Sequence, residues 1–208
     1  MRAQQREPGE WVDGFLFVAN RPILDFLNTK PVLGEGPTEL LVDVHAVERW
    51  FIGAGIVSSA KAKSLMRSWR NSSEAASLLK NLIAFRERLR EAVLRIEDGL
   101  APGDEFLQEI NSGLVHHPPV MVLSRRKGQI VREPLLNLSR PSDLWSPLLD
   151  GAADLLSERE VHRIRKCEAC VIHFFDTSKK GSRRWCSMNI CGNKLKVAAY
   201  QQRKRGSE

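Results

Sequence analysis

The position of the cysteines is the feature that most constrains this chain. All four lie between positions 167 and 191 of the 208 residues, and the first 166 residues contain none. Their spacing is C-x2-C, then fifteen residues, then C-x4-C, formed by Cys167, Cys170, Cys186 and Cys191. Two cysteines separated by two residues can sit on a tight turn whose backbone amides face the sulfurs. A second pair arriving about fifteen residues later completes a tetrahedral set of thiolates, so the spacing predicts one metal site.

Zinc is the metal that this ligand set favours. Four thiolates close the coordination shell and leave no position open for water, so we expect a structural rather than a catalytic ion. A rubredoxin-like iron site would use the same four ligands. A different interpretation makes C-x-x-C a redox pair with two bystander thiols, but that would call for a thioredoxin-like strand and helix around the pair. Disulfides are not expected, because a chain of this length can bury a core without them.

The residues around the cysteines predict a treble-clef-like finger. The stretch between the two pairs suits a hairpin with strands near 171–176 and 183–186 and a turn near 179–181. Asn189 is expected to cap a helix that runs to about Arg205, which places the fourth cysteine in its first turn. A segment of about fifty residues with little apolar content needs the metal in order to fold.

The motifs of this segment resemble the CGNR zinc finger. They read C-E-A-C from Cys167, F-D-T-S from Phe175, S-R-R-W-C-S-M from Ser182 and C-G-N-K-L-K from Cys191. Lys194 stands where the family name has an arginine. The substitution keeps the positive charge but not the bidentate geometry of a guanidinium group.

Upstream of the finger, the chain resembles the ABATE domain. The segment that carries this resemblance is L-D-F-L-N-T, from Leu24 to Thr29. ABATE domains precede the CGNR finger in bacterial proteins described as stress-induced transcription regulators, so the resemblance implies DNA binding and regulation. We therefore expect an ABATE-like helical domain in residues 1–158, for sensing or dimerisation, and a nucleic-acid-binding finger in residues 159–208.

The C-terminal segment carries the positive charge of the chain. From Arg159 to Glu208, thirteen lysines and arginines stand against four acidic residues, a net charge of +9, whereas residues 1–158 have a net charge of −2. A field of that sign concentrated on about fifty residues favours a polyanion. The side chains expected to contact phosphates are Lys179, Lys180, Arg183, Arg184, Lys194, Lys196, Arg203 and Lys204. In another interpretation, Arg183 or Arg184 pairs with Asp176 and braces the finger.

Hydrophobic periodicity predicts a mostly helical first domain with a small sheet, so the expected fold class is α+β with a C-terminal treble-clef-like zinc finger. Helices are expected at about 43–54, 58–69, 73–98, 104–111 and 142–157. A hairpin is expected from Pro119 to Pro134, with its turn at 126–128. Residues 11–29 indicate an irregular or short-strand opening.

Asp25, Asn28 and His45 are the candidates for a ligand pocket in the first domain. In an alternative interpretation, the histidine is exposed or satisfied on its helix, and the other two side chains cap and turn the backbone. The sequence contains no G-x-S-x-G motif, P-loop, dinucleotide fingerprint or suitably placed carboxylate pair. We therefore do not expect an enzyme, and no residue is assigned a catalytic role.

The composition and the N-terminus indicate a cytoplasmic protein without membrane contact. Hydrophobic residues make up 42% and charged residues 27% of the chain, apolar stretches such as 120–123 are too short to cross a bilayer, and the first residues lack the apolar core of a secretion signal. The sequence predicts a DNA-binding transcriptional regulator with one structural zinc. The alternatives are a zinc-stabilised RNA-binding or protein-interaction module, and a small-molecule-binding domain braced by the finger. Homo-oligomerisation is compatible with all three.

Overall fold

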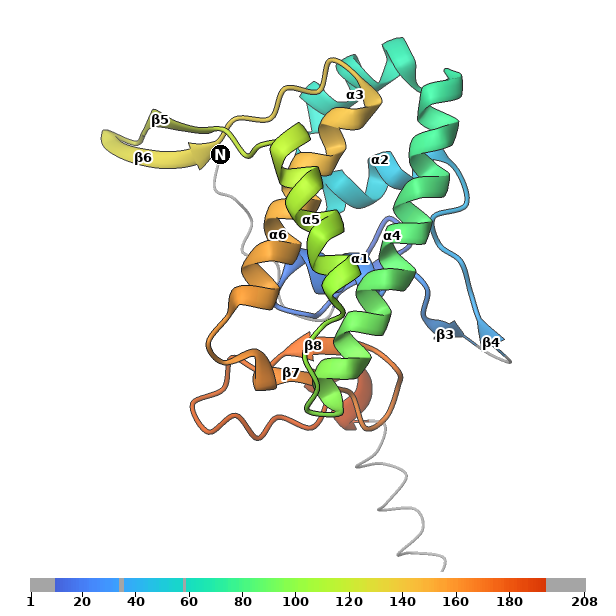
Figure 1. The fold of residues 1–208 in the computed structure, drawn as a ribbon, viewed down its shortest axis with the longest axis vertical. Coiled ribbons are helices and arrows are strands. Elements are labelled where there is room, and N and C mark those ends of the chain that lie inside the picture. Colours follow the sequence, from blue (N-terminus) through green and yellow to red (C-terminus); the bar gives the residue numbers. More distant parts are fainter. Residues whose placement is uncertain (1–9, 34–35, 58, 194–208) are drawn as a thin grey trace, which may run out of the picture. The chain divides into compact units, whose positions relative to one another are not determined.

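The computed structural model describes residues 10–33, 36–57 and 59–193 (Figure 1). Packing divides the chain into two compact units. The helical unit spans Leu41–Val161, and the finger unit combines Met1–Leu40 with His162–Glu208. The sequence places a linear boundary between residues 158 and 159, whereas packing groups the first forty residues with the C-terminal segment. The sensing or dimerising role expected for the first domain stays a prediction.

The helical unit is built from five α-helices in its described residues: α2 (Val44–Gly53), α3 (Ser59–Trp69), α4 (Ser73–Glu97), α5 (Asp104–His116) and α6 (Trp145–Ser157). Side-chain caps begin two of them. The carboxylate of Asp43 accepts from the Ala46 amide at 2.6 Å, and the Ser72 hydroxyl accepts from the Ala75 amide at 3.1 Å. Each cap pairs an amide that the first helical turn leaves without an intrahelical partner.

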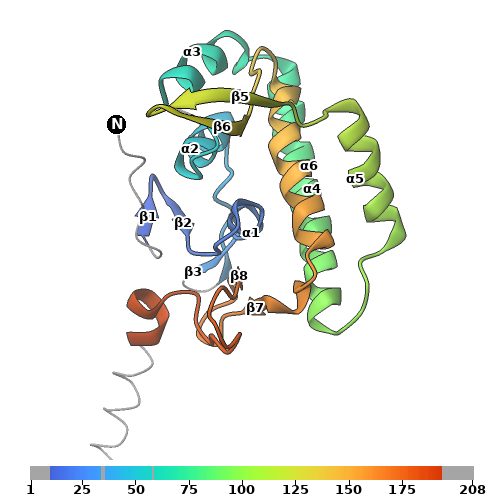
Figure 2. The same cartoon turned by 90° about the vertical axis from the view of Figure 1, so that its left-hand side faces the viewer.

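The core of the helical unit lies where α4, α5 and α6 run side by side (Figure 2). Phe85 on α4 contacts Phe106 of α5 and Trp145 of α6, with ring centroids 5.6 and 5.4 Å apart. Gly113 of α5 allows a close approach of Leu149 on α6, because a Cβ at this position would lie 2.8 Å from the leucine methyl groups. The three helices are therefore held by interlocking aromatic and aliphatic side chains.

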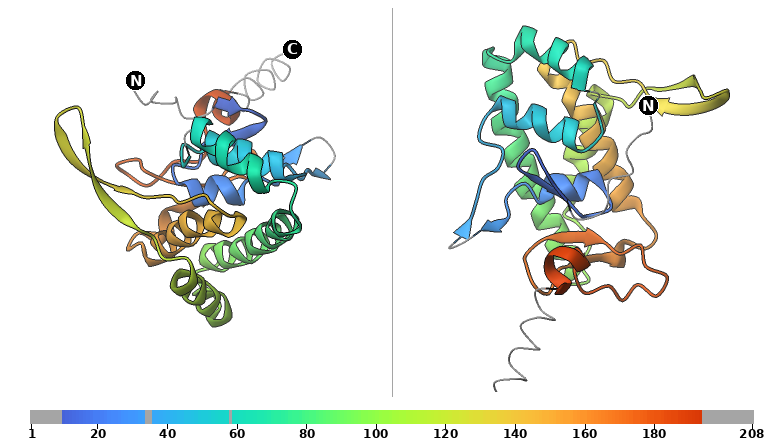
Figure 3. Two further views of the ribbon diagram at one scale, coloured as in Figure 1. Left: turned by 90° about the horizontal axis from the view of Figure 1, so that it is seen from above. Right: turned by 180° about the vertical axis from the view of Figure 1, so that it is seen from behind.

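A two-stranded ribbon follows α5 in the chain and precedes α6. It consists of β5 (Met121–Arg126) and β6 (Gln129–Pro134). Figures 1 and 3 show it extending away from the helices of its unit. Lys127 and Gly128 form the turn with φ angles of 49° and 81°, the left-handed conformation that suits a two-residue hairpin loop. The short 3-10 helix η1 (Pro141–Leu144) follows and leads into α6.

The finger unit contains short elements from both ends of the chain. The N-terminal part supplies β1 (Glu10–Val12), β2 (Phe15–Phe17), α1 (Pro22–Leu27), β3 (Val32–Leu33) and β4 (Gly36–Pro37). The C-terminal part supplies β7 (Ile164–Lys166), which pairs antiparallel with β8 (His173–Phe175), and the turn η3 (Met188–Gly192). Helix α1 packs against β8, so residues separated by about 145 positions share one core.

The α+β class with a C-terminal zinc finger is confirmed, as are the predicted hairpin and the helices α2, α3 and α4. Helix α5 continues to His116 rather than ending near residue 111. The strand predicted near 183–186 is wrong, because β8 pairs with β7 instead. Helix α1 was not predicted, because all its residues after Pro22 are buried and leave no polar stripe. In the part of the chain that the structure describes, no helix combines the length and apolarity of a membrane span.

Candidate metal centre

The first two cysteines lie on the turn of a hairpin. Cys167 directly follows β7, and Cys170 lies three residues before the start of β8 at His173. The Cys167 amide donates to the Ile172 carbonyl at 2.9 Å and closes the turn. The hydrogen bond with Cys186 is the main cause that lowers the pKa of Cys170, and the backbone amide of Ile172 acts in the same direction. This is the tight turn with sulfur-facing amides that the C-x2-C spacing predicts.

The other two cysteines flank a second turn. Cys186 is buried, and Cys191 lies within η3. The predicted cap at Asn189 is wrong: the cap is Ser187, whose hydroxyl accepts from the amides of Asn189 and Ile190 at 3.2 and 3.4 Å. The Ser187 hydroxyl can reach the amides two and three residues later, so the turn begins at Met188. The fourth cysteine, Cys191, therefore still lies in the first turn. The helix expected to run on to about residue 205 lies, beyond residue 193, outside the described residues.

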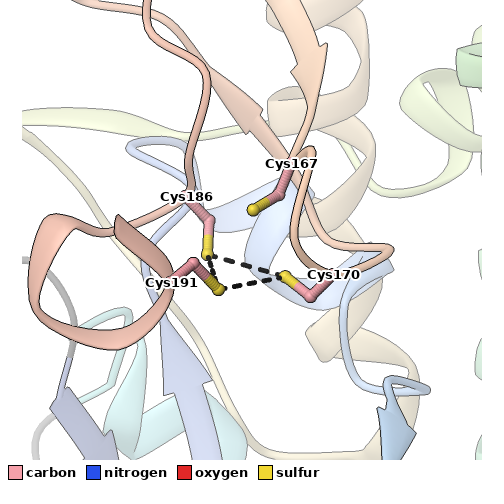
Figure 4. Close-up of side chains that lie close together, drawn as sticks. All are labelled: Cys167, Cys170, Cys186 and Cys191. Atoms are coloured by element: carbon pink, nitrogen blue, oxygen red, sulfur yellow. Dashed lines mark hydrogen bonds between the residues drawn. The ribbon is translucent and has the colours of Figure 1, made fainter. Parts of the chain in front are cut away.

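The four sulfurs gather at one point (Figure 4). All lie within 4.8 Å of one another, and Cys170, Cys186 and Cys191 form a triangle with edges of 3.7, 3.6 and 3.6 Å. A tetrahedron of thiolates around zinc, with Zn–S bonds of about 2.3 Å, has edges of roughly 3.8 Å. The second pair is therefore part of the site and not a set of bystander thiols, and the geometry fits one structural zinc.

The electrostatics of the cluster are compatible with a bound cation. The hydrogen bond that the Cys186 thiol donates to Cys170, together with burial and the charges of the other sulfurs, raises the pKa of Cys186 far above its ordinary value. Burial is the main cause that raises the pKa of Cys191 to about 12, whereas the hydrogen bond from Cys186 is the main cause that lowers the pKa of Cys170 to about 5. Four thiolates at these distances repel one another, and a bound divalent ion makes them compatible.

Gly192 lets the backbone pass close to neighbouring side chains at the fourth ligand. A Cβ at this position would lie 2.7 Å from Sδ of Met188 and 3.2 Å from Cε3 of Trp185. A larger residue after Cys191 would force the side chains of Met188 and Trp185 to shift. Trp185 is half-buried, with its indole nitrogen enclosed, so this side chain is part of the packing beside the fourth ligand.

The loop between the two turns is fixed by hydrogen bonds from arginines and to an aspartate. The buried carboxylate of Asp176 accepts from the backbone amides of Ser178 and Arg183, each at 2.8 Å. Arg163 donates to the carbonyls of Asp176 and Ser178 at 3.2 and 2.8 Å, and Arg165 donates to the carbonyl of Gly181 at 2.6 Å. The sequence did not single out Arg163 and Arg165, because their partners are backbone carbonyls that no residue pattern identifies.

Two of the predicted phosphate contacts are occupied within the finger. The guanidinium group of Arg183 donates to the carbonyls of Trp185 and Cys186, and it lies 4.6 Å from the centre of the Phe174 ring. Arg184 is exposed and donates from Nε to both carboxylate oxygens of Glu168 at 2.8 and 2.7 Å. Arg183 therefore braces the finger, although Asp176 accepts from its backbone amide and not from its side chain.

The remaining cations fall into two groups. Lys179 and Lys180 are exposed on the loop between the two turns. Lys194, Lys196, Arg203 and Lys204 lie outside the described residues. The assignment of these side chains to nucleic acid stays a prediction.

The N-terminal segment of the finger unit is bonded directly to β8. Asn28 donates from Nδ2 to the His173 carbonyl at 2.8 Å and accepts the His173 amide on Oδ1 at 3.1 Å. The Phe175 amide donates to the Ala19 carbonyl at 2.8 Å, and Asn20 donates to the Phe175 carbonyl at the same distance. The L-D-F-L-N-T segment therefore supports the strand that follows the first cysteine pair.

The three residues predicted to line a pocket have different surroundings. Asp25 is buried and accepts from the amides of Val18 and Ala19, both at 2.9 Å. Asn28 is bonded to β8, as described above. His45 is exposed on α2 of the helical unit, with its Nδ1 3.2 Å from Nη1 of Arg70. Backbone hydrogen bonds account for the first two side chains, and the pocket stays a prediction.

Two family models match the chain. Residues 20–159 match the ABATE model, described as "Putative stress-induced transcription regulator", and residues 163–204 match the CGNR zinc finger. Among proteins with curated descriptions, none matches this chain. The second match contains all four cysteines of the metal centre. The chain therefore belongs to the ABATE family, and its C-terminal segment is a CGNR zinc finger with one structural zinc site.

Proposed function

We propose that this protein is a DNA-binding transcriptional regulator of the cytoplasm whose finger unit contacts the phosphate backbone. The proposal is supported by the regulator description of its family, by the zinc finger and by the net charge of +9 in residues 159–208. The helical unit would then supply the sensing or dimerising part. Neither family description names a catalytic activity.

The observation that carries the proposal is the position of Lys179 and Lys180. Both side chains are exposed. The backbone on either side of them is fixed by hydrogen bonds, because Arg163 donates to the carbonyl of Ser178 and Arg165 donates to the carbonyl of Gly181. Two ammonium groups on a loop that is already ordered can bind phosphates without a further entropic cost for ordering the backbone. Side chains that only form a solvated surface would not need such a braced loop.

Arg184 is the third described side chain that we assign to phosphate contact. Both members of its ion pair with Glu168 are exposed, with exposed side-chain fractions of 62% for Arg184 and 46% for Glu168. An ion pair this exposed contributes little to stability, so a phosphate can replace the carboxylate at small cost. Arg183 is not among the side chains that we assign to phosphate contact, because its guanidinium group donates to two backbone carbonyls of the finger.

The experiment measures binding of the full-length, zinc-loaded protein to a labelled DNA duplex between about 50 and 200 mM salt. Each phosphate contact contributes about −0.9 to the slope of log affinity against log salt. The double variant Lys179→Glu, Lys180→Glu should therefore bind more weakly and with a slope shallower by about 2. The matched control reverses two exposed cations of the helical unit, Arg49→Glu and Lys80→Glu.

Two results would overturn the proposal. One is a wild-type affinity that barely changes with salt. The other is an equal loss in the lysine variant and in its control, which would indicate a general charge effect. Competition with single-stranded and duplex RNA at the same salt tests the RNA-binding alternative, since preference for RNA would assign the finger to that class.

A further inference from the structure

The β5–β6 ribbon has one face that no element of its own unit covers. In its register Leu123 lies opposite Arg132, and Arg125 lies opposite Ile130. Side chains directly opposite each other in an antiparallel pair point to the same side, and every second residue along a strand does so too. The face defined here as the ribbon face therefore consists of Met121, Leu123, Arg125, Ile130, Arg132 and Pro134, all of them exposed.

The ribbon face combines apolar side chains with arginines and contains no acidic residue. Leu123 and Ile130 are 73% and 68% exposed, which is unusual for two large aliphatic side chains on adjacent strands. Glu133, the one acidic residue between 121 and 134, belongs to the opposite face and pairs with Arg126 there. A partner for the ribbon face therefore needs apolar surface and carboxylates together.

Helix α6 of the same chain carries two carboxylates on its outer side, beside the half-buried Pro147 and Gly151. Its buried side is formed by Leu148, Leu149, Ala152 and Leu155. Asp150 and Asp154 lie one turn apart away from that side, and among the described residues no cation pairs with either of them. Burial, followed by the negative charge of Asp154, raises the pKa of Asp150, so the two carboxylates repel each other in the single chain.

We propose that two copies of this chain form a dimer in which the ribbon face of each copy docks on the Asp150–Asp154 side of α6 in the other. Carboxylates at positions i and i+4 of a helix are about 6 Å apart, and diagonal positions on a two-stranded ribbon are about 7–8 Å apart. Arg125 and Arg132 occupy such diagonal positions and have long side chains, so each can reach one carboxylate. Leu123 and Ile130 are then buried in the interface next to the small residue Gly151.

Two other occupants of the ribbon face fit less well. Packing of two ribbon faces against each other would bring four arginines together without a carboxylate, and like charges at an interface oppose association. A nucleic acid would pair with the arginines through its phosphates but would leave the two exposed aliphatic side chains without apolar partners. The outer side of α6 in a second copy offers two carboxylates to the arginines and the small apolar surface of Pro147 and Gly151 to the aliphatic side chains.

The test measures the mass of the full-length, zinc-loaded protein against concentration by sedimentation equilibrium. The wild type should dimerise, and Arg125→Glu with Arg132→Glu should weaken dimerisation at least about tenfold. Asp150→Lys with Asp154→Lys should do the same, and Asp154→Lys alone serves as the milder variant. The control is again Arg49→Glu with Lys80→Glu, which should leave dimerisation unchanged.

Mixing the two double variants gives the decisive result. In the mixed dimer an acidic ribbon meets a basic helix at one contact, and the native ribbon meets the native helix at the other. Dimerisation should therefore return in the mixture although each variant alone is monomeric. A wild type that stays monomeric, or a mixture that does not associate, overturns the proposal. So does a ribbon variant that keeps the wild-type mass and loses affinity for duplex DNA, because the ribbon face would then be a nucleic-acid contact.

Discussion

Asn28 and His173, 145 residues apart in the chain, form two hydrogen bonds in the interior of the finger unit. The side chain of Asn28 pairs with both the amide and the carbonyl of His173, in the way that a neighbouring strand would. His173 begins β8, the strand that follows the turn with the first two cysteines. An asparagine of the ABATE domain thus supports the backbone of the zinc finger.

Replacing Asn28 by alanine should destabilise the finger unit. Both backbone groups of His173 would lose their partner while buried, and a buried unpaired polar group costs about 1–3 kcal/mol. We expect the free energy of unfolding of Asn28→Ala to fall by roughly 2–4 kcal/mol, measured by urea denaturation. Asn111→Ala, at an exposed position of α5, is the control and should change stability by less than about 0.5 kcal/mol. Equal stabilities of the two variants would contradict the assigned role.

Removal of one thiolate should empty the metal centre. The wild type should contain near one zinc per chain by mass spectrometry, since the four sulfurs form one site. Cys170→Ser should lower zinc affinity by at least about tenfold, because a serine hydroxyl is not deprotonated at neutral pH and is a poor zinc ligand. Ser182→Ala, at an exposed position of the same loop, should retain its zinc. Full zinc content in Cys170→Ser would show that the cluster does not act as a four-sulfur site.

Asp25 should make the stability of the finger unit fall as the pH rises. Burial raises its pKa from 3.8 to about 7, although the amides of Ala19 and Val18 that donate to it act in the opposite direction. The folded state then binds the proton more tightly than the unfolded state, so the stabilising contribution is full below about pH 4 and is lost as the pH approaches 7.

The variant Asp25→Asn isolates this effect, because its amide oxygen can still accept from both backbone amides without a charge. Between about pH 5.5 and pH 8 the wild type should lose about 2 kcal/mol relative to Asp25→Asn, measured by urea denaturation. A stability difference between the two proteins that stays constant over this range would contradict the raised pKa.

Arg183 and Arg184, adjacent in sequence, should respond differently to truncation. Arg183→Ala removes two hydrogen bonds to carbonyls beside the third cysteine and the contact with Phe174, and it should cost about 2–3 kcal/mol of unfolding free energy. Arg184→Ala removes an exposed ion pair and a contact with the Trp185 ring, both at the surface, and should cost less than about 1 kcal/mol. Thermal unfolding of the two variants compares them directly, and a reversed order of stabilities would refute the bracing role of Arg183.

Local signals explain the parts of the fold that could be predicted. Asp43 and Ser72 cap helices because a short polar side chain reaches an amide three residues ahead, and such a contact depends on neighbouring residues alone. Lys127 and Gly128 mark the ribbon turn for the same reason. Helix α1 escaped prediction because it is short and buried on all sides, so its residues show no period.

The cysteine spacing by itself determined that this protein binds a metal through four sulfurs, since ligands close in sequence need only two turns to meet. The charge of the C-terminal segment is likewise a property of the sequence. Only the tertiary structure decided that residues 19–28 bond to β8 and that Arg183 is a brace rather than a free cation. These contacts involve backbone carbonyls and amides, which are the same at every position of a chain. A pattern of residue types therefore cannot predict them.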